Sequence, residues 1–108
     1  MTDTPTAPAS VYRNDDRNRY ELTVDGQLAV CEFHRLTNAV MFTHTEVLEP
    51  LEGRGVGSAL VRGTLEDVRA QGLQVLPLCP FVAAFIRRHR EYLELVSPVS
   101  RRQLGADA

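Results

Sequence analysis

The 108-residue chain contains no lysine and no tryptophan, and it has only two cysteines, Cys31 and Cys79. All 12 of its basic residues are arginines, so no lysine amine of the chain itself is available for acylation. The two cysteines are far apart in the sequence and provide neither a disulfide framework nor a Cys-x-x-Cys metal clamp. The sequence therefore predicts a reduced intracellular protein that binds no metal.

An excess of charge is absent as well. The net charge is −2 at pH 7 and the pI is near 5.9, which gives no general attraction to nucleic acid or to an anionic membrane surface. No segment approaches the ~20 apolar residues of a membrane span, and the N-terminus has neither a basic start nor an apolar run. We expect a cytoplasmic protein with no nucleic-acid or membrane partner, whose oligomeric state the sequence does not specify.

A chain of this length, with 44% hydrophobic and 24% charged residues, fits one compact domain. We expect a flexible tail over 1–10, a single domain over 11–97 and a frayed C-terminal tail over 98–108. The last boundary rests on Ser97-Pro98, because the residue before a proline disfavours helical geometry and is expected to end the final helix.

The first strand signals lie between residues 19 and 34. Apolar residues alternate with polar ones from Tyr20 to Val24, and Asp25-Gly26 then supplies a two-residue turn whose twist suits a hairpin. An antiparallel strand pair is predicted over this range.

A third antiparallel strand is predicted over 40–47, where β-branched and aromatic residues are frequent. Side chains alternate between the two faces of a strand. Regular alternation would place His44 and Glu46 on the same face as Val40 and Phe42. His44 and Glu46 would then lie about 7 Å apart and could line one cavity.

The C-terminal half of the chain reads as helix, strand and helix. Apolar residues recur at helical spacing over 55–71, and Gly72 is placed to end this helix in the left-handed conformation. A short buried strand is expected over 73–78, a second helix from Cys79-Pro80, and a last short helix over 91–96. Antiparallel strands followed by β-α-β-α predict an α/β fold (an α+β mixed sheet), with its ligand at the carboxyl end of a strand.

Three glycines at alternate positions, Gly53, Gly55 and Gly57, lead into the first predicted helix. The amides of such a turn can approach an anion closely, and a helix N-terminus attracts negative charge. A nucleoside triphosphate loop would need a lysine where this chain has Ser58. A dinucleotide fingerprint would need wider glycine spacing and an acid at the end of the next strand, which reads Leu76-Pro77-Leu78. Both motifs fit poorly, and the pattern alone is also compatible with a tight corner between a strand and a helix.

A third phosphate motif fits better. The segment Glu52-Gly53-Arg54-Gly55-Val56-Gly57 resembles the loop by which the GNAT superfamily of N-acetyltransferases holds the pyrophosphate of acetyl-coenzyme A, although Glu52 stands where the superfamily usually has Gln or Arg. Three further segments extend the resemblance: His44-Thr45-Glu46-Val47, Pro77-x-Cys79-Pro80-Phe81-Val82 and Arg88-His89-x-Glu91-Tyr92. Over 11–97 the chain is similar to small, minimal GNAT proteins of the YjdJ type.

The resemblance implies a GNAT-like acyl-coenzyme A N-acyltransferase core. The strand at 40–47 would splay from the strand at 73–78, and the acetyl-pantetheine arm would lie in the split. Main-chain groups at the end of the strand at 40–47 would bond the pantetheine amides. The glycine run would face the pyrophosphate, and no metal ion would be needed there. The implied coenzyme-binding residues are Val47, Leu48, Gly53, Arg54, Gly55, Val56, Gly57 and Ser58.

Arginine side chains near the implied loop have two interpretations. Arg54 would support the phosphates or remain a solvated loop side chain. Arg87, Arg88 and His89 could contact the adenosine phosphate end, although a run of charge on a helix is more often a solvated face.

Cys79 is the first candidate for catalysis. Larger GNAT enzymes often carry a tyrosine acid on the helix that follows the strand corresponding to 73–78. The residue at that position here is Ile86. Cys79 lies where the acetyl group would arrive and near the start of a helix, a place where thiols ionise more readily. It could donate a proton to the leaving thiolate or accept the acetyl group as a nucleophile. The alternative is a buried thiol that only packs against the ligand.

His44 and Glu46 are the other catalytic candidates. A neutral His44 could remove a proton from an amine, and Glu46 could orient it or act through water. The alternative is a core histidine beside a solvated carboxylate.

The favoured hypothesis is an N-acetyltransferase with acetyl-coenzyme A as cosubstrate and an unidentified amine, on a small molecule or a protein, as acceptor. The rival hypothesis is a non-catalytic acyl-coenzyme A binding or sensing module, which the missing tyrosine acid supports. A domain that only binds a partner protein is the third.

Overall fold

The computed structural model describes residues 11–104 and contains a five-stranded sheet with the order β1-β2-β3-β4-β5. Neighbouring strands from β1 to β4 run antiparallel, whereas β4 and β5 run parallel. The predicted α+β mixed sheet is confirmed. The expected tail over 1–10 and residues 105–108 lie outside the described residues. The strands are β1 (Tyr12–Asn14), β2 (Arg19–Val24), β3 (Gln27–Arg35), β4 (Ala39–Glu46) and β5 (Gln74–Pro77).

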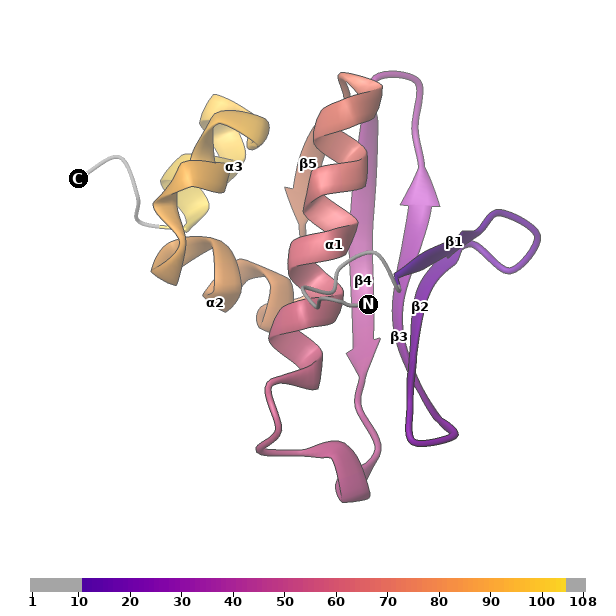
Figure 1. The fold of residues 1–108 in the computed structure, drawn as a ribbon. Coiled ribbons are helices and arrows are strands. Elements are labelled where there is room, and N and C mark those ends of the chain that lie inside the picture. Colours follow the sequence, from indigo (N-terminus) through magenta and orange to yellow (C-terminus); the bar gives the residue numbers. More distant parts are fainter. Residues whose placement is uncertain (1–10, 105–108) are drawn as a thin grey trace.

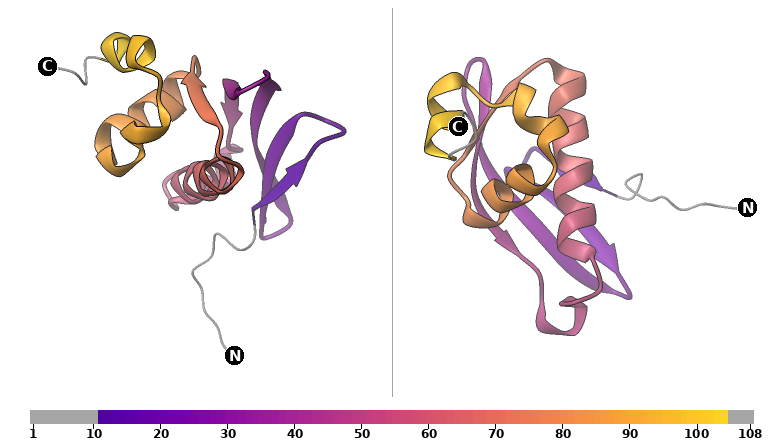
Figure 2. Two further views of the ribbon diagram at one scale, coloured as in Figure 1. Left: turned by 90° about the horizontal axis from the view of Figure 1, so that it is seen from above. Right: turned by 90° about the vertical axis from the view of Figure 1, so that its left-hand side faces the viewer.

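The longest helix, α1, lies across one face of the sheet (Figure 1). Figure 2 (left) looks nearly along α1 and shows β1–β3 on one side of this helix and α2 and α3 on the other, beyond β5. Within residues 11–104 no helix covers the opposite face of the sheet, and none combines the length and apolarity that a bilayer span requires. The helical segments are η2 (Glu49–Leu51), α1 (Val56–Gln71), α2 (Pro80–Arg88), η3 (Arg90–Leu95) and α3 (Pro98–Gln103), of which η2 and η3 are 3-10 helices.

The β2–β3 hairpin forms where the sequence predicts it. Asp25 and Gly26 have positive φ values of 52° and 76°, as both central residues of a type I′ turn require. The register pairs Val24 with Gln27 across the turn. The next strand, β4, also lies within one residue of its predicted range.

Helix α1 matches its predicted range to within one residue. Gly72 ends it in the left-handed conformation (φ 71°), and its amide bonds to carbonyl groups of the last turn. The apolar stripe that faces the sheet is fully buried and consists of Leu60, Val61, Leu65 and Val68. This burial holds the helix on the sheet with its N-terminus at the glycine-rich run.

An aromatic cluster joins the sheet to α1. The ring of Tyr20 lies 5.4 Å from that of Phe33 and 6.4 Å from that of Phe42, measured between centroids. Tyr20 is 2% exposed, and its hydroxyl donates a hydrogen bond to Oδ2 of Asp67 on α1 at 2.6 Å. Burial, together with this bond, raises the pKa of Tyr20 well above its usual value. The hydroxyl therefore stays protonated and ties β2 to α1.

The helix expected over 91–96 is the 3-10 segment η3, which is anchored by Tyr92. This ring is 1% exposed, and its hydroxyl donates to Glu66 on α1 at 2.6 Å. The guanidinium groups of Arg62 and Arg69 lie over the ring, at 5.8 Å and 5.4 Å from its centroid. Tyr92 is therefore a core residue that joins η3 to α1.

Strand β4 contains a bulge that the sequence pattern did not indicate. The register with β3 pairs Glu32 with His44 and then Phe33 with Phe42, so Thr43 is an extra residue without a partner. An extra residue reverses the alternation of all side chains beyond it.

The predicted shared face of β4 is therefore wrong. Val40 and Phe42 are buried on the face that α1 covers, whereas His44 and Glu46 are exposed on the other face. Thr45 takes the inward position that regular alternation would have given to His44.

The prediction of a frayed tail after residue 97 is wrong for 98–104. Residues Pro98–Gln103 form α3, and Leu104 joins the hydrophobic core. The Ser97 hydroxyl caps this helix by accepting a bond from the Ser100 amide (3.2 Å), and Pro98 occupies the first turn, where its missing N–H costs nothing. The Ser-Pro pair that stops one helix therefore starts the next.

Replacing Tyr20 by phenylalanine tests the tie between β2 and α1. Y20F removes one hydrogen bond to a carboxylate and should lower the free energy of unfolding by about 1–2 kcal/mol near pH 7. Folding holds the Tyr20 proton more tightly than the unfolded chain does, so this stabilisation should decrease as the pH rises above about 10, the pKa of an unfolded tyrosine. No lysine titrates in that range.

Urea unfolding should be measured at neutral pH and above about pH 10.5. The difference in free energy of unfolding between the wild type and Y20F should be smaller at the alkaline pH. Y12F changes an exposed tyrosine (61% exposed) and should match the wild type at both values. A gap that is the same at both pH values would contradict the assignment.

Candidate functional site

A cavity of about 280 Å³ opens at the N-terminal end of α1. Of the residues that the resemblance implied for coenzyme binding, Leu48 and Arg54 do not line it and all the others do. Its walls come from the end of β4, the glycine run, the first turn of α1, and α2. The lining residues are Val47, Leu51, Glu52, Gly53, Gly55, Val56, Gly57, Ser58, Phe81 and Arg88.

The backbone of the glycine run requires glycine at two positions. Gly53 and Gly55 have φ values of 80° and 75°, in the left-handed region that side chains disfavour. Gly55 is also the N-cap of α1 and has no side chain that could cap the amides of the first turn. These amides and the positive end of the helix dipole therefore face the cavity.

Gly57 is needed for a different reason. A Cβ atom built on Gly57 would lie 2.5 Å from Cζ of Phe81, so the first turn of α1 and the start of α2 approach too closely for a side chain. Phe81 is 39% exposed and forms a wall of the cavity. The missing side chain at Gly57 thus allows the ring to lie there.

The positive charge at the cavity comes from α2. Arg88 lines the cavity, and no carboxylate of residues 11–104 lies within ion-pair distance of its guanidinium. Arg54 instead forms an ion pair of 2.8 Å with Asp25 in the β2–β3 turn. Glu52 adds one carboxylate to the lining. Arg88 is therefore the unneutralised cation at this site.

Strands β4 and β5 separate beside the cavity. Phe42 and Pro77 are the last residues in register, and the Cys79 amide then donates to the Phe42 carbonyl at 2.8 Å. Beyond this bond the chain enters α2, while β4 continues to Glu46. Residues 43–46 thus have no partner on β5, and the split implied by the resemblance is present.

Cys79 lies at the point of separation. It is the N-cap residue of α2 and is 2% exposed. Its Sγ atom lies 3.3 Å from Oγ1 of Thr45, which also donates to Sγ of Cys31 at 3.6 Å. Burial raises the pKa of Cys31 to about 12. Cys79 does not line the cavity, but Phe81 at the start of the same helix does.

His44 and Glu46 lie on the other face of β4. Nε2 of His44 is 3.7 Å from Oε1 of Glu46, and each side chain is more than half exposed. The structure therefore brings these two residues together, but not with Cys79. They flank the split from the face that α1 leaves uncovered.

Leu51, Glu52 and Phe81 line the cavity but were not among the predicted site residues, and the sequence left Arg88 as one of several basic candidates. The signal for Phe81 was a glycine at an inward position of α1, which indicates a close approach by another side chain. Arg87 and Arg88 could not be separated without the orientation of α2, because successive helical residues differ by about 100° in direction.

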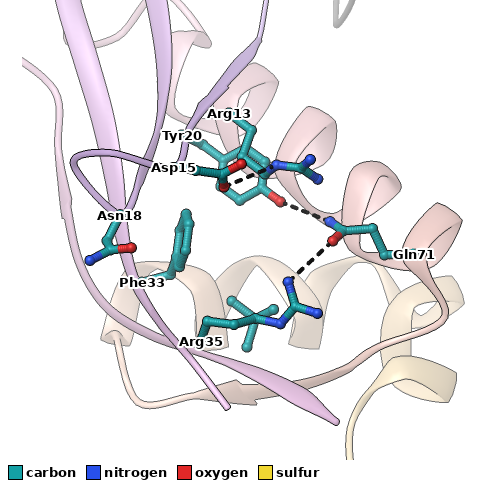
Figure 3. A pocket seen from close by; sticks show the side chains of 8 residues that line it. Arg13, Asp15, Asn18, Tyr20, Phe33, Arg35 and Gln71 are labelled. Atoms are coloured by element: carbon teal, nitrogen blue, oxygen red, sulfur yellow. Dashed lines mark hydrogen bonds and ion pairs between the residues drawn. The ribbon is translucent and has the colours of Figure 1, made fainter. Parts of the chain in front are cut away.

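A second cavity, of about 230 Å³, lies near the C-terminal end of α1 and contains none of the predicted site residues (Figure 3). Its charged groups neutralise one another in part, because Arg13 is paired with Asp15 (3.2 Å) and with Asp67 (2.9 Å). The Arg35 guanidinium donates to the side-chain oxygen of Gln71, at 3.5 Å. The cavity at the N-terminus of α1 is therefore the candidate site.

A mixed sheet whose parallel strands separate beside a glycine-lined helix N-terminus defines a GNAT-like domain. Residues 19–95 match the sequence profile of the GCN5-related N-acetyl-transferase family, so the chain belongs to that family. The chain is also similar to the solution NMR structure of a GCN5-like N-acetyltransferase candidate from Staphylococcus aureus. That match has a TM-score of 0.63 and 22% identity over 81% of this chain and 86% of that one, and it concerns the fold alone. No curated protein sequence matches the chain.

A double-mutant cycle tests the contact between Gly57 and Phe81. G57A alone should lower the free energy of unfolding by about 1 kcal/mol, because the new methyl group must displace the ring. In an F81A background the same change should raise it by about 0.5–1 kcal/mol, because alanine favours a helix more than glycine does. Urea denaturation of the four proteins measures both effects. An effect of the same sign in both backgrounds would show that the ring does not restrict position 57.

Proposed function

We propose that the chain binds acetyl-coenzyme A and transfers its acetyl group to an amine. The observation that carries this proposal is the cavity at the N-terminus of α1, which combines glycine amides, a helix dipole and Arg88, a cation without an ion-pair partner among residues 11–104. Each of these groups favours an anion such as a pyrophosphate. Membership of the GCN5-related family supports acetyl-coenzyme A as the molecule that carries it.

The residues present fit this ligand. Gly53 and Gly55 have open space where a Cβ atom would lie, so a phosphate can approach their main-chain atoms, and the missing side chain at Gly57 leaves room for the Phe81 wall. Val47 and Leu48 follow the part of β4 that has lost its β5 partner, so their main-chain groups would bond the pantetheine amides. Arg88 would contact phosphate directly, whereas Arg54 would hold the loop through Asp25.

Cys79 would act on the donor side. When bound, acetyl-coenzyme A supplies an acetyl group activated as a thioester. Cys79 lies at the split and at the start of α2, so its thiol would either give a proton to the leaving thiolate or accept the acetyl group. Tyr92 is bonded to Glu66 in the core, and Ile86 is fully buried, so neither serves as the acid.

His44 and Glu46 would act on the acceptor side. An amine, on a small molecule or a protein, that reaches β4 from the uncovered face meets the exposed His44 ring. A neutral imidazole can take the proton that the amine must lose, and the Glu46 carboxylate attracts a cationic amine and orients the ring. Donor and acceptor would thus reach β4 from opposite faces.

A second candidate function is binding or sensing of an acyl-coenzyme A without catalysis. It is favoured by the burial of Cys79, which is 2% exposed, and by Ile86 in the place of a tyrosine acid. Tight binding without amine-dependent release of coenzyme A, tested over a broad panel of amines, would establish this function instead.

The role of Arg88 can be tested by binding of coenzyme A. R88Q should weaken binding about 10-fold or more, because a charge-assisted hydrogen bond to phosphate is lost. R87Q removes the same charge from the neighbouring exposed position, which does not line the cavity, and should bind like the wild type. Isothermal titration calorimetry measures both. Equal weakening of binding in the two variants would show that Arg88 contributes only through its positive charge and not through a direct contact with phosphate.

The role of Cys79 can be tested by turnover. If Cys79 is catalytic, C79A should lower kcat for amine-dependent release of coenzyme A by about 100-fold or more. Binding of coenzyme A should change little, because Cys79 does not line the phosphate cavity. An acetyl adduct on Cys79, sought by mass spectrometry after rapid acid quenching, separates the nucleophile from the acid. Full turnover by C79A would remove both roles.

A further inference from the structure

A hydroxyl group lies between two buried thiols at the split. Thr45 Oγ1 is 3.3 Å from Sγ of Cys79 and donates to Sγ of Cys31 at 3.6 Å. Cys31 is completely buried and Cys79 is 2% exposed. The bulge at Thr43 turns Thr45 toward these thiols and His44 away from them. The arrangement therefore depends on the irregularity of β4.

The hydroxyl can serve only one thiol as a donor at a time. A threonine hydroxyl has one hydrogen and two acceptor lone pairs, whereas a thiol is both a weak donor and a weak acceptor. While Cys79 is protonated, its S–H can donate to Thr45, which donates to Cys31. Once Cys79 is a thiolate, Thr45 can donate to it and can accept the S–H of Cys31. All three groups keep a partner in both states.

We infer that Thr45 is a positioning residue whose hydroxyl reverses its hydrogen-bond direction as Cys79 changes between thiol and thiolate, with Cys31 as its second partner. The inference rests on the proposed function, because it gives Cys79 a role in acetyl transfer. It does not depend on which of the two roles Cys79 has.

Both proposed roles of Cys79 pass through its thiolate. As an acid, Cys79 gives its proton to the thiolate of coenzyme A and regains one from the proton that the acylated amine releases. As a nucleophile, Cys79 loses its proton to the departing coenzyme thiolate while its sulfur bonds to the acetyl carbon and the bond from that carbon to the coenzyme sulfur breaks. Attack of the amine on the acetyl-Cys79 thioester then breaks the bond to the Cys79 sulfur, which takes the electron pair, and the proton that the amine loses restores the thiol. In either case the charge on Cys79 lies next to the Thr45 hydroxyl, and a charge-assisted hydrogen bond is stronger than a neutral one.

The surroundings of the three groups are compatible with these two alternative hydrogen-bond arrangements. Among residues 11–104, Cys31 and Cys79 are the titratable groups in contact with the Thr45 hydroxyl. Burial raises the pKa of Cys31 to about 12, so this thiol stays protonated and can donate. His44 and Glu46 project from the opposite face of β4. The charged residues of α2 are confined to its last turn.

The test is the titration of Cys79, followed in the full-length protein by NMR of ¹³Cβ-labelled cysteine and assigned with C31A and C79A. Removal of the hydroxyl in T45V should move the Cys79 titration curve toward higher pH than in the wild type, because the thiolate loses its donor. T45S keeps the hydroxyl and should restore the wild-type titration. C31A, which removes only the second donor, should cause a smaller rise. T23V changes an exposed threonine on β2 and should have no effect.

Several outcomes would overturn the inference. These are equal Cys79 titrations in T45V and T23V, failure of T45S to restore the wild-type curve, and a wild-type Cys79 that does not titrate while the chain is folded. T45A replaces T45V if the latter does not fold. The titration needs no acetyl-coenzyme A, so it remains informative if no amine is acetylated. If turnover is found, T45V should lower kcat about 10-fold or more with KM for acetyl-coenzyme A unchanged.

Discussion

The extra residue in β4 is the constraint on which the rest of the site depends. Thr43 has no partner on β3, so each side chain beyond it changes face. Thr45 enters the core beside the thiols, and His44 moves to the face that α1 leaves uncovered. One bulge therefore separates a buried thiol from a histidine in contact with water on the two sides of one strand.

The cavity is assembled from segments that are distant in the sequence. The glycine run supplies main-chain amides, and α2 contributes both the apolar wall at Phe81 and the cation at Arg88. The parallel pairing of β4 and β5 places the start of α2 beside that run. A loop of glycines alone would attract any small anion, and the walls that Phe81 and Arg88 add are what set this cavity apart from such a loop.

Elements with strong local signals could be predicted from the sequence, and features set by pairing could not. Asp25-Gly26 and Gly72 each adopt positive φ, and the elements beside them form as predicted. The bulge at Thr43 depends on how β4 pairs with β3, and no local sequence pattern in β4 indicates this register. Ser97-Pro98 is ambiguous because the same residues end one helix and cap another. The glycine turn at the start of α1 was therefore predictable, whereas the separation of His44 from Cys79 was not.

The C-terminal segment also closes the sheet. Strand β5 is short and runs parallel to β4, and its outer edge would present unpaired main-chain groups beside the buried Val75. Val96 pairs with Val75 along that edge, and α3 follows directly. An open apolar edge is a template for pairing with another chain. Within residues 11–104, the segment from Val96 into α3 therefore occupies part of this edge, which leaves less of it open to pairing with another chain.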